Sequence, residues 1–183
     1  MHKVDLSSYE NPEYDPGAWI GKRILWGVFS AVFFQSYLLP ISSIKRFILR
    51  LFGAKIGKGV VIKPSVLIKH PWYLRVGDFS WIGEKVWIDN LITVEIGSNV
   101  CISQGAMLLT GNHNYKSPGF DLIMNEIRID NGAWIGAKSI VCPGVLCGNQ
   151  SVLTVGSVAT RNLDPNMIYS GNPAVAVRER ILA

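Results

Sequence analysis

The chain has 183 residues, 49% of them hydrophobic and 17% charged, so it is expected to fold as one domain, with or without an appendage. Its net charge of +5 suits an anionic ligand or a membrane surface, although an ordinary protein surface can carry the same charge. The lysines and arginines are dispersed and match no recognition motif, so nucleic acid is not expected as a partner. Three cysteines without a CxxC pair argue against a disulfide framework and favour a cytoplasmic location.

The first 54 residues are predicted to form a helical segment. Residues 24–44 carry no charge and have the length needed to span a bilayer, roughly 20 residues. Their late start and the lack of a clean cleavage site argue against a secretory signal, and their serines, Gln35 and Pro40 weaken a spanning interpretation. Three alternatives stay open: a helix packed on the protein, a helix on a membrane surface, and a membrane span.

Residues 43–52 follow as a second predicted helix. Lys45, Arg46 and Arg50 alternate with apolar residues at helical spacing, which is typical of a basic amphipathic helix, and Gly53 is a natural stop. Residues 24–52 together could give a peripheral contact at the inner face of a membrane.

Residues 55–160 are dominated by an aliphatic residue that returns every six positions. The residues of this ladder are Ile56, Ile62, Ile68, Val76, Ile82, Ile88, Ile96, Ile102, Leu108, Ile129, Ile135, Val141, Cys147 and Leu153. A period of six fits neither a helix nor a plain strand, and hexapeptide repeats indicate an all-β solenoid, the parallel β-helix. The first three coils begin at Ile56, Val76 and Ile96, so each has three hexads plus two residues that should stack as a ridge.

The residue just before each ladder position should face outward, yet many of these residues are apolar. They are Val61, Leu67, Tyr73, Trp81, Trp87, Cys101, Met107, Trp134, Ile140, Leu146 and Val152. Because large exposed apolar surfaces mark interfaces or ligand grooves, we expect the flat faces to pack against other copies. A closed cyclic trimer is the simplest such assembly.

The ladder is interrupted once, by an excursion loop at residues 109–128 that carries His113. Loops on rigid scaffolds hold functional residues, and histidine is the usual general base near neutral pH. Of the other histidines, His2 lies in the tail and His70 is expected at the surface. A metal site would need several converging histidines, so no metal is expected. Cys147 occupies a ladder position and is expected to be a small core residue.

Several motifs resemble those of hexapeptide-repeat acyltransferases. They are residues 129–137 (IDNGAWIGA), 143–145 (PGV), 155–158 (VGSV) and 170–174 (SGNPA). A closer resemblance is to the colanic-acid-biosynthesis acetyltransferase family, which is related to the maltose and galactoside O-acetyltransferases. The motifs that carry it are residues 51–57 (LFGAKIG), 87–91 (WIDNL), 101–105 (CISQG) and 110–113 (TGNH).

The resemblance implies a left-handed parallel β-helix, a homotrimer with sites between subunits, and acetyl transfer from acetyl-CoA to a sugar hydroxyl in polysaccharide biosynthesis. By the same likeness His113 is the general base, and the backbone N–H of Ala137 stabilises the thioester oxyanion. Asp89, Asn90 and Asn112 match the acceptor-binding region, although Asp89 and Asn90 could equally be ordinary turn residues.

The resemblance also implies a set of residues that bind the cofactor. Its members are Trp134, Gly136, Ala137, Val155, Gly156, Thr160, Arg161 and Arg178. Arg178 and Arg180 lie in residues 161–183, expected to be a C-terminal tail, where they either reach the nucleotide phosphates or remain solvated. Two alternative functions stay open: N-acyl transfer to an amino sugar, and a non-catalytic trimeric binding scaffold.

Overall fold

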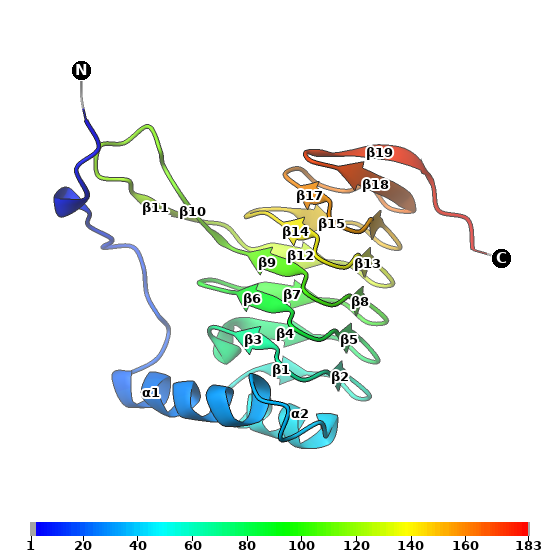
Figure 1. The fold of residues 1–183 in the computed structure, drawn as a ribbon, viewed down its shortest axis with the longest axis horizontal. Helices are drawn as coiled ribbons and strands as arrows, with labels where there is room; N and C mark the ends of the chain where they lie inside the picture. Colours follow the sequence, from blue (N-terminus) through cyan, green and yellow to red (C-terminus); the bar gives the residue numbers. More distant parts are fainter. Residues whose placement is uncertain (1–2, 183) are drawn as a thin grey trace.

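The computed structural model describes residues 3–182, so His2 lies outside the described part. Most of the chain forms a parallel β-helix, with helices at one end and a hairpin at the other (Figure 1). Each coil contributes one strand to each of three sheets. The first sheet contains β1 (Lys55–Ile56), β4 (Leu74–Val76), β7 (Val94–Ile96), β12 (Ile127–Ile129) and β15 (Leu146–Cys147). The parallel β-helix predicted from the six-residue period is confirmed.

The other two sheets are built in the same way. The second contains β2 (Val61–Ile62), β5 (Trp81–Ile82), β8 (Cys101–Ile102), β13 (Trp134–Ile135), β16 (Val152–Leu153), β18 (Met167–Gly171) and β19 (Ala174–Glu179). The third contains β3 (Leu67–Ile68), β6 (Trp87–Asp89), β9 (Met107–Leu109), β14 (Ile140–Val141) and β17 (Val158–Ala159). A separate antiparallel hairpin joins β10 (Gly111–His113) to β11 (Leu122–Met124).

The ladder residues form the core of the β-helix. Equivalent corners pair in register, as Ile56 does with Val76 and Val76 with Ile96, and every ladder residue is buried. Stacked aliphatic side chains therefore fill the axis while backbone groups pair between coils. Cys147 is fully buried in this column, and burial raises the pKa of its thiol to about 12, which keeps it protonated and inert.

The outward row is largely accessible in the single chain. Trp81 and Trp134 are 56% and 47% exposed, respectively, on the second sheet, and Trp87 is exposed on the third. Val152 is an exception because it is buried.

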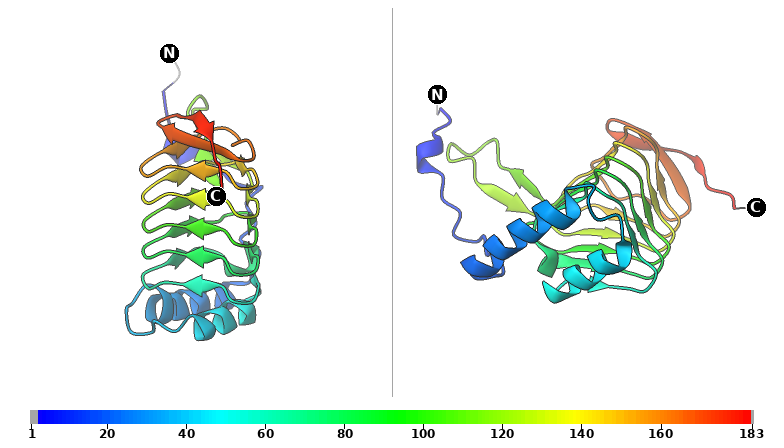
Figure 2. Two further views of the ribbon diagram at one scale, coloured as in Figure 1. Left: turned by 90° about the vertical axis from the view of Figure 1, so that its right-hand side faces the viewer. Right: turned by 60° about the horizontal axis from the view of Figure 1, so that its bottom comes forward.

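Two α-helices and a π-helical turn cover the end of the β-helix where the first coil begins (Figure 2). They are α1 (Ile20–Phe29), η2 (Ser30–Phe34) and α2 (Ser42–Leu51), preceded by the short 3-10 helix η1 (Leu6–Ser8). Trp26, Phe34 and Leu49 are buried against the first coil. None of the helices within residues 3–182 is long and apolar enough to cross a membrane.

The helices supply hydrogen-bond donors to the carbonyl groups of the first coil. In later coils these carbonyls accept from the coil below; for example, the Val76 carbonyl accepts from the N–H of Gly57. The first coil has no coil below it, so its carbonyls need other donors. Arg50 donates to the carbonyl of Ile56 at 2.7 and 3.0 Å, and Arg46 donates to that of Val60 at 2.7 Å.

Three further donors complete this cap. Lys45 Nζ donates to the carbonyl of Lys63 at 3.0 Å, Ser42 Oγ to that of Ile62 at 3.3 Å, and Trp26 Nε1 to that of Ile68 at 2.9 Å. Lys45 is fully buried, and burial lowers the pKa of its ammonium group. The basic side chains of α2 therefore face the protein, and Gly53, with φ of 99°, ends the helix.

Strands β18 and β19 form the opposite end. Strand β18 adds to β16 in parallel and turns back through an antiparallel pairing with β19. Residues 161–183, expected as a tail, thus contain a hairpin that covers the last coil.

We predict that Arg50→Ala lowers the free energy of unfolding by about 1–2 kcal/mol, because it leaves the partly buried carbonyl of Ile56 without its charged donor. Urea unfolding followed by circular dichroism measures this change. Lys55→Ala, at the same end but exposed, is the control and should stay within about 0.5 kcal/mol. Equal stability of both variants would show that the bonds of Arg50 do not stabilise the fold.

Candidate active site

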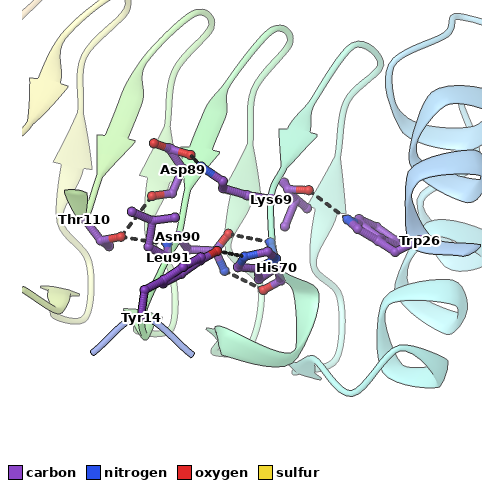
Figure 3. Close-up of polar contacts among 9 residues, drawn as sticks. Tyr14, Trp26, Lys69, His70, Asp89, Asn90, Leu91 and Thr110 are labelled. Atoms are coloured by element: carbon purple, nitrogen blue, oxygen red, sulfur yellow. Dashed lines mark hydrogen bonds and ion pairs between the residues drawn. The ribbon is translucent and has the colours of Figure 1, made fainter. Parts of the chain in front are cut away.

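The extra residues of each coil form a ridge along the edge between the third and first sheets. The first ridge segment is His70 with η3 (Pro71–Tyr73), the second is residues 90–93, and the third is the excursion loop. The Asn90 amide accepts from the N–H of His70 at 3.0 Å and donates to its carbonyl at 2.6 Å. Thr110 Oγ1 accepts from the N–H of Leu91 at 2.8 Å, which fixes the start of the excursion (Figure 3).

His70 is buried, so the prediction that it lies at the surface is wrong. It is 6% exposed, packed between Trp72 and Tyr14, and the Tyr14 hydroxyl lies 2.7 Å from its Nε2 (Figure 3). The N-terminal segment covers this part of the ridge, which the repeat pattern did not show. Burial, aided by the charge of Lys69, lowers the pKa of His70 to about 4.

His113 lies on β10, at the point where the excursion hairpin projects from the ridge. Its Nδ1 is 2.8 Å from the carbonyl of Phe120, and the two rings stack with centroids 4.6 Å apart. A carbonyl only accepts hydrogen bonds, so Nδ1 carries the proton and Nε2 of the neutral ring keeps a free lone pair. Phe120 has φ of 56°, a left-handed conformation that turns its carbonyl toward the imidazole.

The segment at residues 3–19 also reaches this loop, a contact that sequence reasoning missed. The N–H of Asp5 donates to the carbonyl of Pro118 at 2.9 Å, and the ring of Tyr9 lies 6.0 Å from that of His113. Farther along, Trp72 Nε1 donates to the carbonyl of Pro16 at 2.8 Å. The N-terminal segment therefore runs from α1 along the ridge to the excursion (Figure 1). Its contacts are tertiary, and its sequence has no motif that signals them.

The three predicted acceptor-binding residues lie near this same edge. Asp89 is partly exposed and forms an ion pair with Lys69 at 2.9 Å. Asn112 is exposed, and its Oδ1 accepts from the N–H of His113 at 2.8 Å. Asn90 is completely buried and its amide is occupied by the backbone of His70. Asn90 therefore behaves as the turn residue of the open alternative.

Four of the predicted cofactor residues gather at a different edge, between the second and third sheets. Gly136 and Ala137 lie one coil below Val155 and Gly156, and the N–H of Gly156 donates to the carbonyl of Ala137 at 2.9 Å. A Cβ on Gly136 would lie 2.6 Å from the carbonyl oxygen of Leu153, so only glycine fits. Within the described chain the N–H of Ala137 donates to no acceptor, and Val155 is exposed.

Trp134 flanks this edge on the second sheet, and its Nε1 donates to Ser103 Oγ at 2.9 Å. Below it, a groove of about 700 Å³ is lined by Trp81, Glu84, Gln104 and Lys138, among other residues. This groove therefore borders the edge that carries Ala137, on the side toward the first coil.

The remaining cofactor residues are spread over the upper coils. Thr160 and Arg161 are exposed at the far end of β17, and Arg178 is exposed on β19. Arg180 is held by the carbonyls of Gly132 and Gln150 at 2.9 and 3.1 Å. Its Nη1 atom is therefore bound to backbone carbonyls, a role that neither alternative considered for Arg180 included.

The structure does not bring His113 and Ala137 together in one chain. His113 projects from the edge between the third and first sheets, whereas Ala137 lies between the second and third (Figure 1). Among residues 3–182 no group of three or more histidine, cysteine or acidic side chains could hold a metal ion.

Comparison with known proteins identifies the family. The chain is 38% identical over 177 residues to WcaF of Escherichia coli (strain K12), provisionally described as a colanic acid biosynthesis acetyltransferase, and covers 97% of both chains. The chain belongs to this family of hexapeptide-repeat acetyltransferases. It is also 30% identical over 130 residues to the galactoside O-acetyltransferase of the same strain, covering 69% of this chain and 64% of that one. The scan against family models found no match.

Solved structures agree on the fold. The hexapeptide-repeat acetyltransferase VCA0836 of Vibrio cholerae, in complex with acetyl-CoA, superposes with a TM-score of 0.82 at 21% identity. The match covers 96% of this chain and 97% of that one. The acetyltransferase family inferred from the sequence motifs is thus confirmed.

The buried His70 predicts a pH dependence of stability. In the unfolded chain its imidazole becomes protonated as the pH falls below about 6.5, whereas in the folded protein it becomes protonated only near pH 4. The stability that neutral His70 contributes is therefore complete above pH 6.5 and is lost as the pH falls toward 4, by about 3 kcal/mol.

Urea unfolding between pH 7.5 and 4.5 measures this loss. His70→Gln should flatten the pH dependence, whereas Tyr14→Phe should retain most of it, because burial is the main cause of the lowered pKa. A His70→Gln profile as steep as that of the wild type would contradict the assignment.

Proposed function

We propose that this protein is an acetyl-CoA-dependent O-acetyltransferase that acts on a sugar hydroxyl in polysaccharide biosynthesis. The observation that carries the proposal is the pairing of His113 Nδ1 with the Phe120 carbonyl, which leaves Nε2 as a proton acceptor on a projecting loop. The family relationship supplies the acetyl-transfer class, and the acetyl-CoA complex of the Vibrio relative supports the donor.

The reaction needs no covalent enzyme intermediate. Nε2 of His113 takes the proton of the acceptor hydroxyl as its oxygen attacks the thioester carbonyl. The resulting tetrahedral oxyanion collapses, the C–S bond breaks, and the leaving CoA sulfur receives the proton from the imidazolium. Such a base contributes about 10² to 10⁴ in rate.

The edge at Ala137 supplies the other half of the site. The free N–H of Ala137 would donate to the oxyanion, since a fixed backbone donor stabilises charge without reorganisation. Trp134, Gly136, Val155, Gly156 and Thr160 would line the pantetheine arm. Arg161 and Arg178, both exposed, would bind the phosphates.

The two halves come from different edges, so one site requires two subunits. The exposed apolar side chains of the outward row, such as Trp81 and Trp87, support packing between copies. A homotrimer closes this packing and repeats the same junction three times. The Asp89 edge near His113 would then hold the acceptor opposite the cofactor edge of its neighbour.

The acceptor sugar is the open part of the proposal. The similarity to a galactoside O-acetyltransferase favours a hydroxyl acceptor over an amine, although an amino sugar would use the same base. A cytoplasmic glycan precursor attached to lipid would explain a peripheral membrane contact of residues 24–52.

His113→Ala should lower acetyl transfer by about 10² to 10⁴, because the attacking hydroxyl loses its base. The assay incubates acetyl-CoA with a panel of sugars and amino sugars and measures free thiol. Binding of CoA, measured by calorimetry, should stay near the wild-type value. Lys116→Ala, an exposed change in the same loop, is the control. Full turnover by His113→Ala would exclude the base assignment, and an inactive wild type that still binds CoA would favour a scaffold.

Subunit mixing tests the shared site. His113→Ala and Val155→Trp, which blocks the exposed cofactor edge, should each be inactive alone. When both chains are co-expressed with different tags, mixed trimers contain junctions with one intact half from each chain. About a quarter of the wild-type activity should return in a random mixture. No recovery in purified mixed trimers would place both halves of the site in one chain.

A further inference from the structure

The helices at the base of the molecule carry an apolar surface on the side that faces away from the β-helix. The residues of this N-terminal apolar face are Ile20, Ile24, Val28 and Val32 from α1 and η2, and Ile44, Phe47 and Leu51 from α2. All are exposed; Ile24, Phe47 and Leu51 have exposed fractions of 62%, 66% and 67%. Spacings of three and four residues place each set on one side of its helix.

The opposite sides of these helices already contact the protein. In α1 the protein side includes Trp26, and in α2 it includes Lys45 and Leu49, all buried. Both helices lie across the same end of the β-helix (Figure 2), so their two apolar stripes are directed away from it. A helix that is apolar on both sides is expected to be covered on both sides.

The cap on the first coil explains this orientation. Lys45, Arg46 and Arg50 donate to backbone carbonyls, so the basic side of α2 is directed toward the β-helix. Ile44, Phe47 and Leu51, on the other side of α2, then face outward. The exposed face is therefore a consequence of contacts that hold the fold together.

The segment that forms the helices and the first coil carries charge of one sign. Residues 16–77, which include the helices and the first coil, contain ten lysines and arginines and no aspartate or glutamate. The cations are Lys22, Arg23, Lys45, Arg46, Arg50, Lys55, Lys58, Lys63, Lys69 and Arg75. All 13 acidic residues of the chain lie outside this range.

We propose that the N-terminal apolar face rests on an anionic lipid bilayer, with α1 and α2 lying in the plane of the headgroups. Exposed apolar side chains on helices within a positively charged segment are the two features that amphipathic helices use to bind such a surface. A second copy docked face to face would bring two such positively charged segments together, which costs free energy. The proposal develops the membrane contact above, but it rests on no catalytic step.

Flotation of the full-length protein with vesicles tests the proposal in the absence of acetyl-CoA and acceptor. Vesicles that contain phosphatidylglycerol should bind the protein, and phosphatidylcholine vesicles should bind it more weakly. The variant Ile24→Ser/Phe47→Ser/Leu51→Ser should bind at least about tenfold more weakly, since the buried apolar area supplies the anchoring free energy.

The matched control is Val175→Ser/Val177→Ser/Ile181→Ser, three exposed aliphatic residues at the opposite end of the chain, which should bind like the wild type. Circular dichroism and thermal unfolding confirm that both triple variants are folded.

The proposal fails if the wild type does not float with anionic vesicles, or if the two triple variants bind equally. It also fails if the wild type forms a larger assembly without lipid that the N-terminal variant abolishes. Acetyl transfer to a water-soluble sugar, measured separately, shows whether the catalytic proposal stands independently.

Discussion

The fold depends on how the carbonyl groups at the open end of the β-helix find hydrogen-bond donors. Within the solenoid each coil supplies N–H groups to the next, and this pairing cannot continue below the first coil. Side chains of α1 and α2, chiefly Trp26, Arg46 and Arg50, take the place of the missing coil. At the other end, β18 continues the second sheet and β19 closes it. The two ends of the β-helix are thus covered differently: side-chain donors cover the first coil, and an added hairpin covers the last.

The regular repeat of the coils also determines where candidate site residues can lie. Two extra residues per coil build the ridge, and Asn90 and Thr110 bond each ridge turn to its neighbour. The excursion is the third of these turns enlarged, so it projects from a fixed support rather than from a flexible connection. That support holds His113 in one tautomer through Phe120, while the Ala137 edge keeps a free amide on another side. A rigid prism cannot bend these edges together, which is why the proposed site combines edges of two subunits.

The β-helix and the position of its core could be predicted from the sequence because the ladder repeats one local rule many times. His113 could be selected for a related reason, since it interrupts that rule. The environment of His70 could not, because its burial comes from Tyr14 and Trp72, whose contact joins segments far apart in the chain. The bonds of Arg180 were missed for the same reason, because they depend on a tertiary partner and not on a local pattern. For Asn90 the sequence left the turn-residue alternative open, and the structure shows its amide bonded to the backbone of His70.

The hexapeptide repeat does not explain the N-terminal apolar face or the excursion that carries His113. The N-terminal segment connects these two features. It leaves the N-terminal apolar face at Trp19, passes Tyr14 beside His70, and ends against the excursion, where Tyr9 lies next to His113. The excursion starts in the third coil, two coil spacings of about 4.8 Å above the first, and the helices add a layer of about 10 Å. With that face on a bilayer and the prism upright, the proposed base would therefore lie about 20 Å from the lipid. A lipid-linked acceptor would have to extend that far, which favours a hydroxyl on an outer sugar of an oligosaccharide over one on the sugar next to the lipid.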